Sequence, residues 1–121
     1  MKIEGEGQLL RVFIGESDRW QGRPLYEAIV LKAREMGMAG ATVVRGTMGF
    51  GAHSRIHSAK VLRLSEDLPI VIEIADKAER IAAFLPHLDS MVTDGMIALD
   101  NVRIMAYRHN AASENSASQE T

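Results

Sequence analysis

Six segments with regularly spaced apolar residues follow one another along the chain, and their order constrains the fold more than any other feature. Four of them have apolar residues at every second position, which predicts strands, and two have them at every third or fourth position, which predicts helices. The predicted strands span residues 8–14, 42–48, 70–75 and 96–107, and the predicted helices span residues 24–37 and 76–92. This order is the ferredoxin-like βαββαβ pattern, in which two helices cover one face of a four-stranded antiparallel sheet. We therefore predict an α+β fold.

The ends of both predicted helices carry residues that favour starting or stopping a helix. Pro24 suits the first turn of the first helix, and Gly37 marks its end. Asp76, with Glu79 three positions later, matches the capping-box pattern and predicts the start of the second helix.

Length and composition predict a single domain with a short polar tail. The 121 residues are 46% hydrophobic and 25% charged, which is ordinary for one globular domain. We assign this domain to residues 1–110. Residues 111–121 contain no large apolar side chain, and a segment that buries no apolar surface stays disordered.

Several kinds of chemistry are excluded by what the sequence lacks. The chain has no cysteine, which excludes disulfides, Cys-ligated zinc, iron–sulfur clusters and thiol catalysis. No Ser-His-Asp arrangement, His-Glu-x-x-His helix or close pair of strand-end carboxylates can be recognised, so we expect a binding protein and not an enzyme. No apolar run approaches the length of a membrane span and no secretion signal is recognisable. We expect a cytoplasmic protein with no nucleic-acid partner.

The face of the predicted sheet that the helices leave open is strongly apolar. We expect Phe13, Val43, Val71, Met105 and Tyr107 to point to this side. An apolar surface of this size is rarely left in water. A second copy of the same sheet is the simplest cover, so we expect a homo-oligomer.

Acidic residues are absent from residues 36–65, although the whole chain has sixteen of them. The cationic and imidazole side chains in this window are Arg45, His53, Arg55, His57, Lys60 and Arg63. The window predicts either a solvated basic loop or a segment that binds an anion.

A glycine cluster and a pair of histidines lie inside the same window. Gly49-Phe50-Gly51, with Gly46 just before it, forms either a tight structural turn or a row of backbone N–H groups that holds a phosphate. His53 and His57 are four positions apart, which on a helix would direct both imidazoles at one metal ion. No Cys, Asp or Glu lies nearby to complete a ligand set, so exposed loop histidines are the other interpretation.

Five short motifs occur in a fixed order within residues 8–107. They are Gly40-Ala41-Thr42-Val43, Gly49-Phe50-Gly51, Leu68-Pro69 followed by residues 71–74, Asp94-Gly95-Met96-Ile97 and Val102-Arg103-Ile104. This set resembles the PII superfamily of trimeric signalling proteins, and most closely its PII-like branch, long classed as a domain of unknown function. The corresponding PII motifs include Gly-Met-Thr-Val, Gly-Phe-Gly, Asp-Gly-Lys-Ile and Val-Arg-Ile-Arg.

The resemblance implies a PII-like trimer that binds an adenine nucleotide in clefts between its subunits. It implies nucleotide contacts from the backbone at residues 40–42 and 49–51, with the Asp94-Gly95 turn and Arg103 near the phosphates. Residues 52–59 would correspond to the T-loop, through which PII proteins dock on transporters, channels or enzymes. The implied ligand is ADP, ATP or AMP, and no cofactor or metal is required.

Two cations of the PII site are replaced in this chain. Met96 stands where PII has its phosphate-binding lysine, and Met105 stands where PII has a second arginine. We expect residues of the acid-free window to supply the missing charge. The expected nucleotide-binding residues are therefore Gly40, Ala41, Thr42, Arg45, Gly49, Phe50, Gly51, His53, Arg55, Asp94, Gly95 and Arg103.

We predict a PII-like signalling protein in which nucleotide occupancy orders a basic loop and thereby regulates a target protein, such as a membrane transporter or channel. A ligand that binds only the ordered loop shifts the population toward it. Two alternatives remain open. One is a CutA-like trimer that binds divalent metal through His53 and His57, and the other is a small nucleotide-hydrolysing enzyme.

Overall fold

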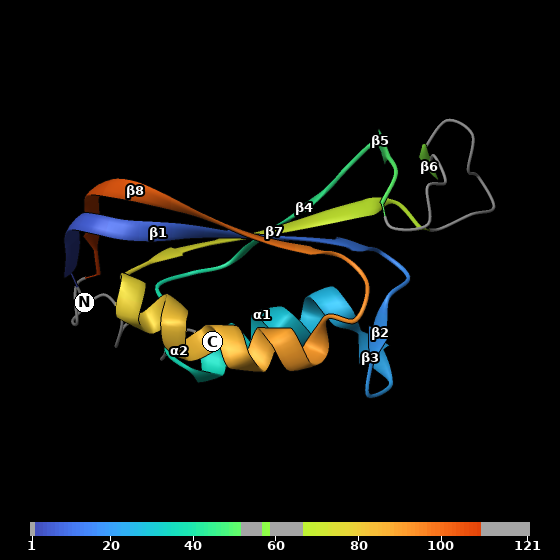
Figure 1. Ribbon diagram of the computed structural model, residues 1–121, viewed down its shortest axis with the longest axis horizontal. Coiled ribbons are helices and arrows are strands. Elements are labelled where there is room, and N and C mark those ends of the chain that lie inside the picture. The colour runs from blue at the N-terminus through green and yellow to red at the C-terminus, as the bar shows by residue number, and fades with distance from the viewer. Residues whose placement is uncertain (1, 52–56, 59–66, 110–121) are drawn as a thin grey trace, which may run out of the picture.

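The computed structural model describes residues 2–51, 57–58 and 67–109. Four strands form one antiparallel sheet in the order β4–β7–β1–β8, and two helices lie against one of its faces (Figure 1). These elements are β1 (Lys2–Gly15), α1 (Leu25–Glu35), β4 (Thr42–Arg45), β7 (Pro69–Asp76), α2 (Ala78–Met91) and β8 (Met96–Arg108). Two short strand pairs lie outside the sheet: β2 (Arg19–Trp20) with β3 (Arg23–Pro24), and β5 (Met48–Gly49) with β6 (His57–Ser58). The predicted four-stranded antiparallel sheet with two helices is confirmed.

The core lies between the sheet and the helices. It is built from alternate side chains of the two central strands and from one apolar stripe of each helix. The strand members are Leu10, Val12, Ile14, Ile70, Ile72 and Ile74, and the helix members are Leu25, Ala28, Ile29, Ala33, Ile81, Phe84, Leu88 and Met91.

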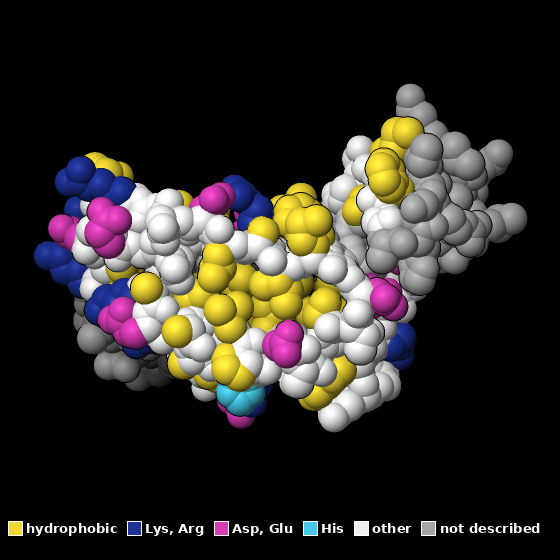
Figure 2. All heavy atoms as spheres, in the orientation of Figure 1, with side chains coloured by type: hydrophobic (Ala, Val, Ile, Leu, Met, Phe, Trp, Pro, Cys, Tyr) yellow, Lys and Arg dark blue, Asp and Glu magenta, His cyan; other side chains and the backbone are white. Residues whose placement is uncertain are grey.

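The helices cover the inner face of the sheet less completely at its β8 edge. Leu99 of β8 pairs with the buried Leu10 and so shares its side of the sheet, yet Leu99 is exposed. Figure 2 shows apolar side chains at the surface between β8 and α2. Apolar surface is therefore exposed at this edge as well as on the open face.

The two helices begin and end close to the predicted residues, but one predicted cap is wrong. Gly37 ends α1 with a φ of 72°, where its N–H donates to Arg34 O and the N–H of Met38 donates to Ala33 O. This is the glycine-terminated helix end expected from the sequence. Asp76, in contrast, is the last residue of β7, and the N-cap of α2 is Lys77, which makes no side-chain capping bond.

The predicted second strand, residues 42–48, is divided into two. β4 ends at Arg45, and the N–H of Gly46 donates to Pro69 O (2.7 Å). The chain then leaves the sheet, and β5 pairs with β6. A Cβ at Gly46 would lie 2.7 Å from Pro69 Cγ, and one at Gly49 would lie 3.0 Å from the same atom. The glycines therefore allow the chain to pass closely over the proline ring.

On two strands, β4 and β8, the side chains that lie on the open face are not the predicted ones. Val43 pairs with the buried Ile72 and so faces the helices, while Val44 pairs with Val71 on the open face. A strand of four residues has too few alternating side chains to show from sequence which of them face the helices. Pairing with β7 determines this instead.

The last strand also departs from the predicted open face. Met96 pairs with Phe13 and Ile104 pairs with Gly5, so alternate residues from Met96 to Ile104 lie on the open side, and Met105 falls out of this alternation. β8 also contains a bulge between the pairs Gly5–Ile104 and Ile3–Tyr107. Met105 lies in this bulge and is exposed. The Tyr107 hydroxyl donates to Ala39 O (3.0 Å), against the connection between α1 and β4.

The predicted tail, residues 111–121, lies outside the described residues, as do His53 and Arg55. The domain limits at residues 1–110 remain a prediction. Within the part of the chain that the structure describes, no helix has the length and apolar character needed to cross a membrane.

Candidate functional site

The candidate residues lie at two ends of the sheet. We call the end at which β7 begins the Pro69 end, and the opposite end, at which β7 finishes beside Ala39, the Ala39 end. Arg45, Gly49, Phe50, Gly51, Asp94 and Gly95 lie at the Pro69 end, whereas Gly40, Ala41 and Arg103 lie at the Ala39 end. Thr42, the first residue of β4, lies between them.

At the Pro69 end, part of the glycine cluster has a packing explanation. Gly46 and Gly49 both lie against Pro69, as described above, whereas a Cβ at Gly51 would meet no atom within 4 Å. No residue from 45 to 51 has a positive φ. Close approach to Pro69 therefore accounts for Gly46 and Gly49, and Gly51 keeps its backbone open to solvent.

Arg45 is already paired at this end. Its Nη2 contacts Glu16 Oε2, and Glu16 is the first residue after β1. Arg45 ends β4 and Glu16 follows β1, and these two strands flank β7. Sequence reasoning chose Arg45 as a phosphate ligand but did not identify this acidic partner, because Glu16 lies 29 positions away and outside the acid-free window.

The Asp94-Gly95 turn connects α2 to β8 beside the end of β1. Gly95 has a φ of 148°, and a Cβ there would lie 2.5 Å from Phe13 O. Both the backbone angle and the close approach require glycine. Asp94 is exposed beside it.

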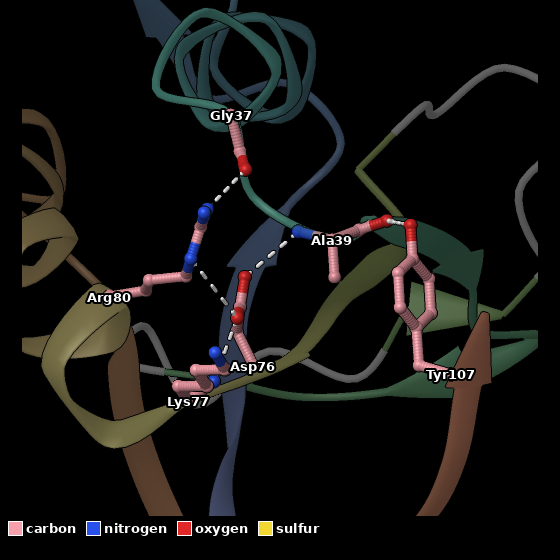
Figure 3. A network of polar contacts seen from close by, with 6 residues as sticks. All are labelled: Gly37, Ala39, Asp76, Lys77, Arg80 and Tyr107. Atoms are coloured by element: carbon pink, nitrogen blue, oxygen red, sulfur yellow. Dashed lines mark hydrogen bonds and ion pairs between the residues drawn. The ribbon is translucent and has the colours of Figure 1, made fainter. Parts of the chain in front are cut away.

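At the Ala39 end, a buried carboxylate holds the connection between α1 and β4 (Figure 3). Asp76 has no exposed surface. Its Oδ2 accepts the N–H of Ala39 (2.8 Å), and its Oδ1 accepts the N–H of Lys77 (2.7 Å) and lies 3.8 Å from Arg80 Nε. A buried carboxylate is stable only when it is paired in this way. Asp76 therefore fixes the backbone just before Gly40.

Two further contacts hold the same connection (Figure 3). The Arg80 guanidinium donates to Gly37 O, and the Tyr107 hydroxyl donates to Ala39 O. Side chains of α2 and β8 thus hold residues 37–39 from two sides. Sequence reasoning missed this network, because its members are distant in sequence and Asp76 also suited a capping box.

Arg103 projects from β8 opposite Glu6 of β1 in the strand register. It is exposed and, within the described residues, makes no side-chain hydrogen bond or ion pair. Tyr107, four residues later on the same strand, reaches Ala39. Arg103 therefore belongs to the Ala39 end.

The two ends are too far apart for one small ligand to touch both on a single chain. Gly95 lies against Phe13, whereas Arg103 lies opposite Glu6, seven residues back along β1. At a rise of about 3.3 Å per residue this separation is about 23 Å. The structure therefore groups the candidate residues but does not bring the two groups together within one chain.

The open face of the sheet carries an apolar row and a charged row. The register aligns Val44, Val71, Phe13 and Met96 across all four strands. In the neighbouring row, Arg11 Nε donates to Glu73 (2.9 Å) and its Nη1 donates to Asp100 (3.3 Å). The hydrogen bond to Glu73 raises the pKa of Arg11, so this guanidinium is a fixed positive charge.

The predicted metal alternative lies largely outside the described residues. His53 is not described, and of residues 57–58 only the backbone strand is. Among the residues that are described, no three His, Asp or Glu side chains gather as metal ligands would.

Comparison with known sequences identifies the family. Residues 7–104 match the family DUF190, described as "Uncharacterized ACR, COG1993". A UPF0166 protein of Aquifex aeolicus (strain VF5) is 36% identical over 98 residues, which cover 81% of this chain and 92% of that protein. A UPF0166 protein of Methanocaldococcus jannaschii is 29% identical over 100 residues, covering 82% and 92%.

Comparison with solved structures identifies the fold. CPII of Thiomonas intermedia K12, a nitrogen regulatory PII-like protein solved with ADP, AMP and bicarbonate, aligns with a TM-score of 0.58 and 17% identity over 86% of this chain and 91% of that one. CutA of Synechococcus elongatus PCC7942 aligns with a TM-score of 0.56 and 13% identity over 95% and 90%. These likenesses concern the fold, and they agree with the motif resemblance in the sequence. The chain therefore belongs to the DUF190 family and has the fold of the PII-like proteins.

Proposed function

We propose that this protein binds an adenine nucleotide between the subunits of a homotrimer and regulates a target protein through that binding. The observation that carries the proposal is the separation of the candidate contacts into a Pro69 end and an Ala39 end, about 23 Å apart along β1. In an assembly, the Pro69 end of one subunit meets the Ala39 end of its neighbour. CPII, whose fold this chain shares, has been solved with ADP and AMP bound.

The open face of the sheet supports the assembly. Its apolar row crosses all four strands at Val44, Val71, Phe13 and Met96, and neither α1 nor α2 covers it. Burial of apolar surface stabilises association by about 25 cal/mol per Å². Enclosure of three such faces around an axis would remove all of them from water, in keeping with the trimer implied by the PII resemblance.

The chemistry of the two ends suits a nucleotide phosphate. Each end has one arginine among the candidate residues, Arg45 or Arg103, and guanidinium groups bind phosphate through paired hydrogen bonds. Phe50 is exposed beside Gly51 and offers a ring on which an adenine base can stack. His53 and Arg55 are proposed to add charge from the same side of the site.

Regulation, not catalysis, is the proposed role. Residues 52–59 follow directly after the proposed contacts at 49–51 and correspond to the T-loop in the PII resemblance. A nucleotide that binds one conformation of this segment better than another shifts its population. The segment then docks on a target protein, with a membrane transporter or channel as the expected class.

Titration calorimetry with AMP, ADP, ATP and cyclic adenine dinucleotides tests the proposal. We expect binding of at least one nucleotide, and we expect Arg103→Ala to weaken it by roughly 10- to 150-fold, the loss that follows removal of a hydrogen bond to a charged group. Arg34→Ala, which removes an exposed arginine of α1, is the matched control and should bind like the parent.

Two results would overturn the proposal. One is that no tested nucleotide binds at millimolar concentration. The other is steady turnover of ATP, which would indicate a hydrolase. Zinc binding that is lost on His53→Ala would instead favour the metal-binding alternative.

A further inference from the structure

One cation of the proposed site is held by an acidic side chain of the same subunit. Arg45 Nη2 contacts Glu16 Oε2 at the Pro69 end. The backbones of both residues are fixed to the start of β7: the Glu16 N–H donates to Leu68 O (2.8 Å), and Arg45 pairs with Ile70 in the sheet. Because the two backbones are anchored on the same strand, little chain entropy is lost in holding the side chains together.

The two side chains differ in their access to solvent. The Glu16 side chain is 21% exposed, whereas that of Arg45 is 56% exposed. The carboxylate is therefore partly shielded, and the guanidinium faces outward. Arginine has five N–H donors in a planar fork, so one carboxylate does not exhaust its capacity for anions.

The other carboxylates of this turn are engaged with backbone amides. Asp18 accepts the N–H of Gly15 (2.9 Å), and Asp67 accepts the N–H of Ser17 (3.0 Å). Glu16 is the carboxylate at this turn that pairs with Arg45. The Glu16 carboxylate therefore occupies the place beside Arg45 that a ligand anion would take.

We infer that Glu16 competes with the ligand phosphate for Arg45 and thereby limits the affinity of this site. The inference rests on the proposed nucleotide binding. A phosphate that approaches Arg45 must either displace the carboxylate or lie beside it against like-charge repulsion. A ligand without a phosphate does not compete for the guanidinium and is unaffected. Glu16 is thus a residue that sets specificity, although it need not touch the ligand.

Glu16→Gln tests this inference because it keeps the size and one acceptor oxygen of the side chain but removes the charge. We expect calorimetry to show ATP and ADP binding about two- to fivefold more tightly than in the parent, the change expected for a partly exposed ion pair. Adenosine should bind equally to both proteins. Glu27→Gln, which removes an exposed charge on α1 away from this turn, is the matched control for net charge and should match the parent.

The double variant shows whether the effect passes through Arg45. Arg45→Ala should weaken ATP binding, and Glu16→Gln in that background should give no further change. Equal ATP affinity in the parent and in Glu16→Gln would overturn the competition and leave nucleotide binding intact. Lack of binding of ATP and of inorganic pyrophosphate by both proteins would overturn the proposed function together with this inference. Unchanged thermal unfolding of Glu16→Gln would establish that the fold is preserved.

Discussion

Asp76 shows how one side chain can link three elements. Its carboxylate, with no exposed surface, accepts N–H groups from the connection before β4 and from the start of α2. Without it, both donors would be left in a partly buried site without this acceptor. The loss of a buried acceptor costs more than the bond itself contributes, because nothing replaces it.

We therefore expect Asp76→Ala to lower the free energy of unfolding by about 2–4 kcal/mol. Urea denaturation at a fixed protein concentration measures this change. Asp89→Ala, at an exposed position of α2, is the control and should change stability by less than about 0.5 kcal/mol. Equal midpoints for the two variants would show that residues 37–39 do not depend on Asp76.

The role of Asp76 could not be predicted from the sequence. Together with Glu79, it matched the capping-box pattern. A helix-capping aspartate and an aspartate at the end of a strand cannot be distinguished from the sequence alone. The distinction depends on Ala39, whose N–H reaches Asp76 only after β4 has paired with β7. Arg103, in contrast, could be identified as an exposed cation on the last strand.

Among the elements, β4 and β5 are separated where the chain passes closely over the ring of Pro69. Gly46 and Gly49 lie against the Pro69 ring, and this approach accompanies the departure of the chain from the sheet after Arg45. Gly51, two residues further on, touches nothing within 4 Å. Packing against Pro69 therefore restricts the side chain at positions 46 and 49 but not at position 51.

Substitution by alanine should affect stability differently at Gly46 and at Gly51. Gly46→Ala places a Cβ 2.7 Å from Pro69 Cγ, and we expect it to destabilise the protein by about 1–3 kcal/mol. Gly51→Ala has room and no positive φ, so we expect no loss or a gain of up to about 1 kcal/mol. Thermal unfolding followed by circular dichroism compares the two. A stable Gly46→Ala variant would mean that Pro69 moves aside at little cost.

The sequence located some elements well and misjudged others. β7 and α2, with eight and fourteen residues, were found where expected. The longest strand, β1, begins at Lys2, six residues before the predicted start at residue 8. β4 has only four residues, so its phase was wrong by one position and Val44, not Val43, lies on the open face. The phase of β8 was also wrong by one position, because Ile104 and not Met105 alternates with Met96 on the open face, and the bulge beyond Ile104 has no clear sequence signal.

At the scale of the whole molecule, the open face is the surface on which the proposed trimer depends. Val44 lies in the apolar row and is 48% exposed in the single chain. A lysine there is tolerated in a monomer because the side chain can reach water. In a trimer that encloses this face, the same charge would be buried without a partner.

Val44→Lys should therefore dissociate the proposed trimer into folded monomers at micromolar concentration, as measured by light scattering after size exclusion. Leu31→Lys is the control, since Leu31 is 42% exposed but belongs to α1. It should leave the trimer intact. A parent protein that is itself monomeric would contradict the assembly, and an intact Val44→Lys trimer would show that another surface holds it together.

The candidate site also belongs to this scale. Individual candidate contacts could be selected from short motifs, but the motifs do not show which of these residues lie close together in space. The structure shows that Gly95 and Arg103 lie at different ends of the sheet. In the proposed trimer, a site divided in this way would be completed by a neighbouring subunit.

The proline at the start of β7 has a consequence for how this chain can change over time. Its ring leaves little room for a Cβ at either Gly46 or Gly49, so the three positions compete for one small volume. A larger residue at either glycine is easier to accommodate when position 69 also changes, and replacement of the proline would relieve both glycines at once. Substitutions here are therefore expected to arise together, so that variation at 46, 49 and 69 is correlated within the family.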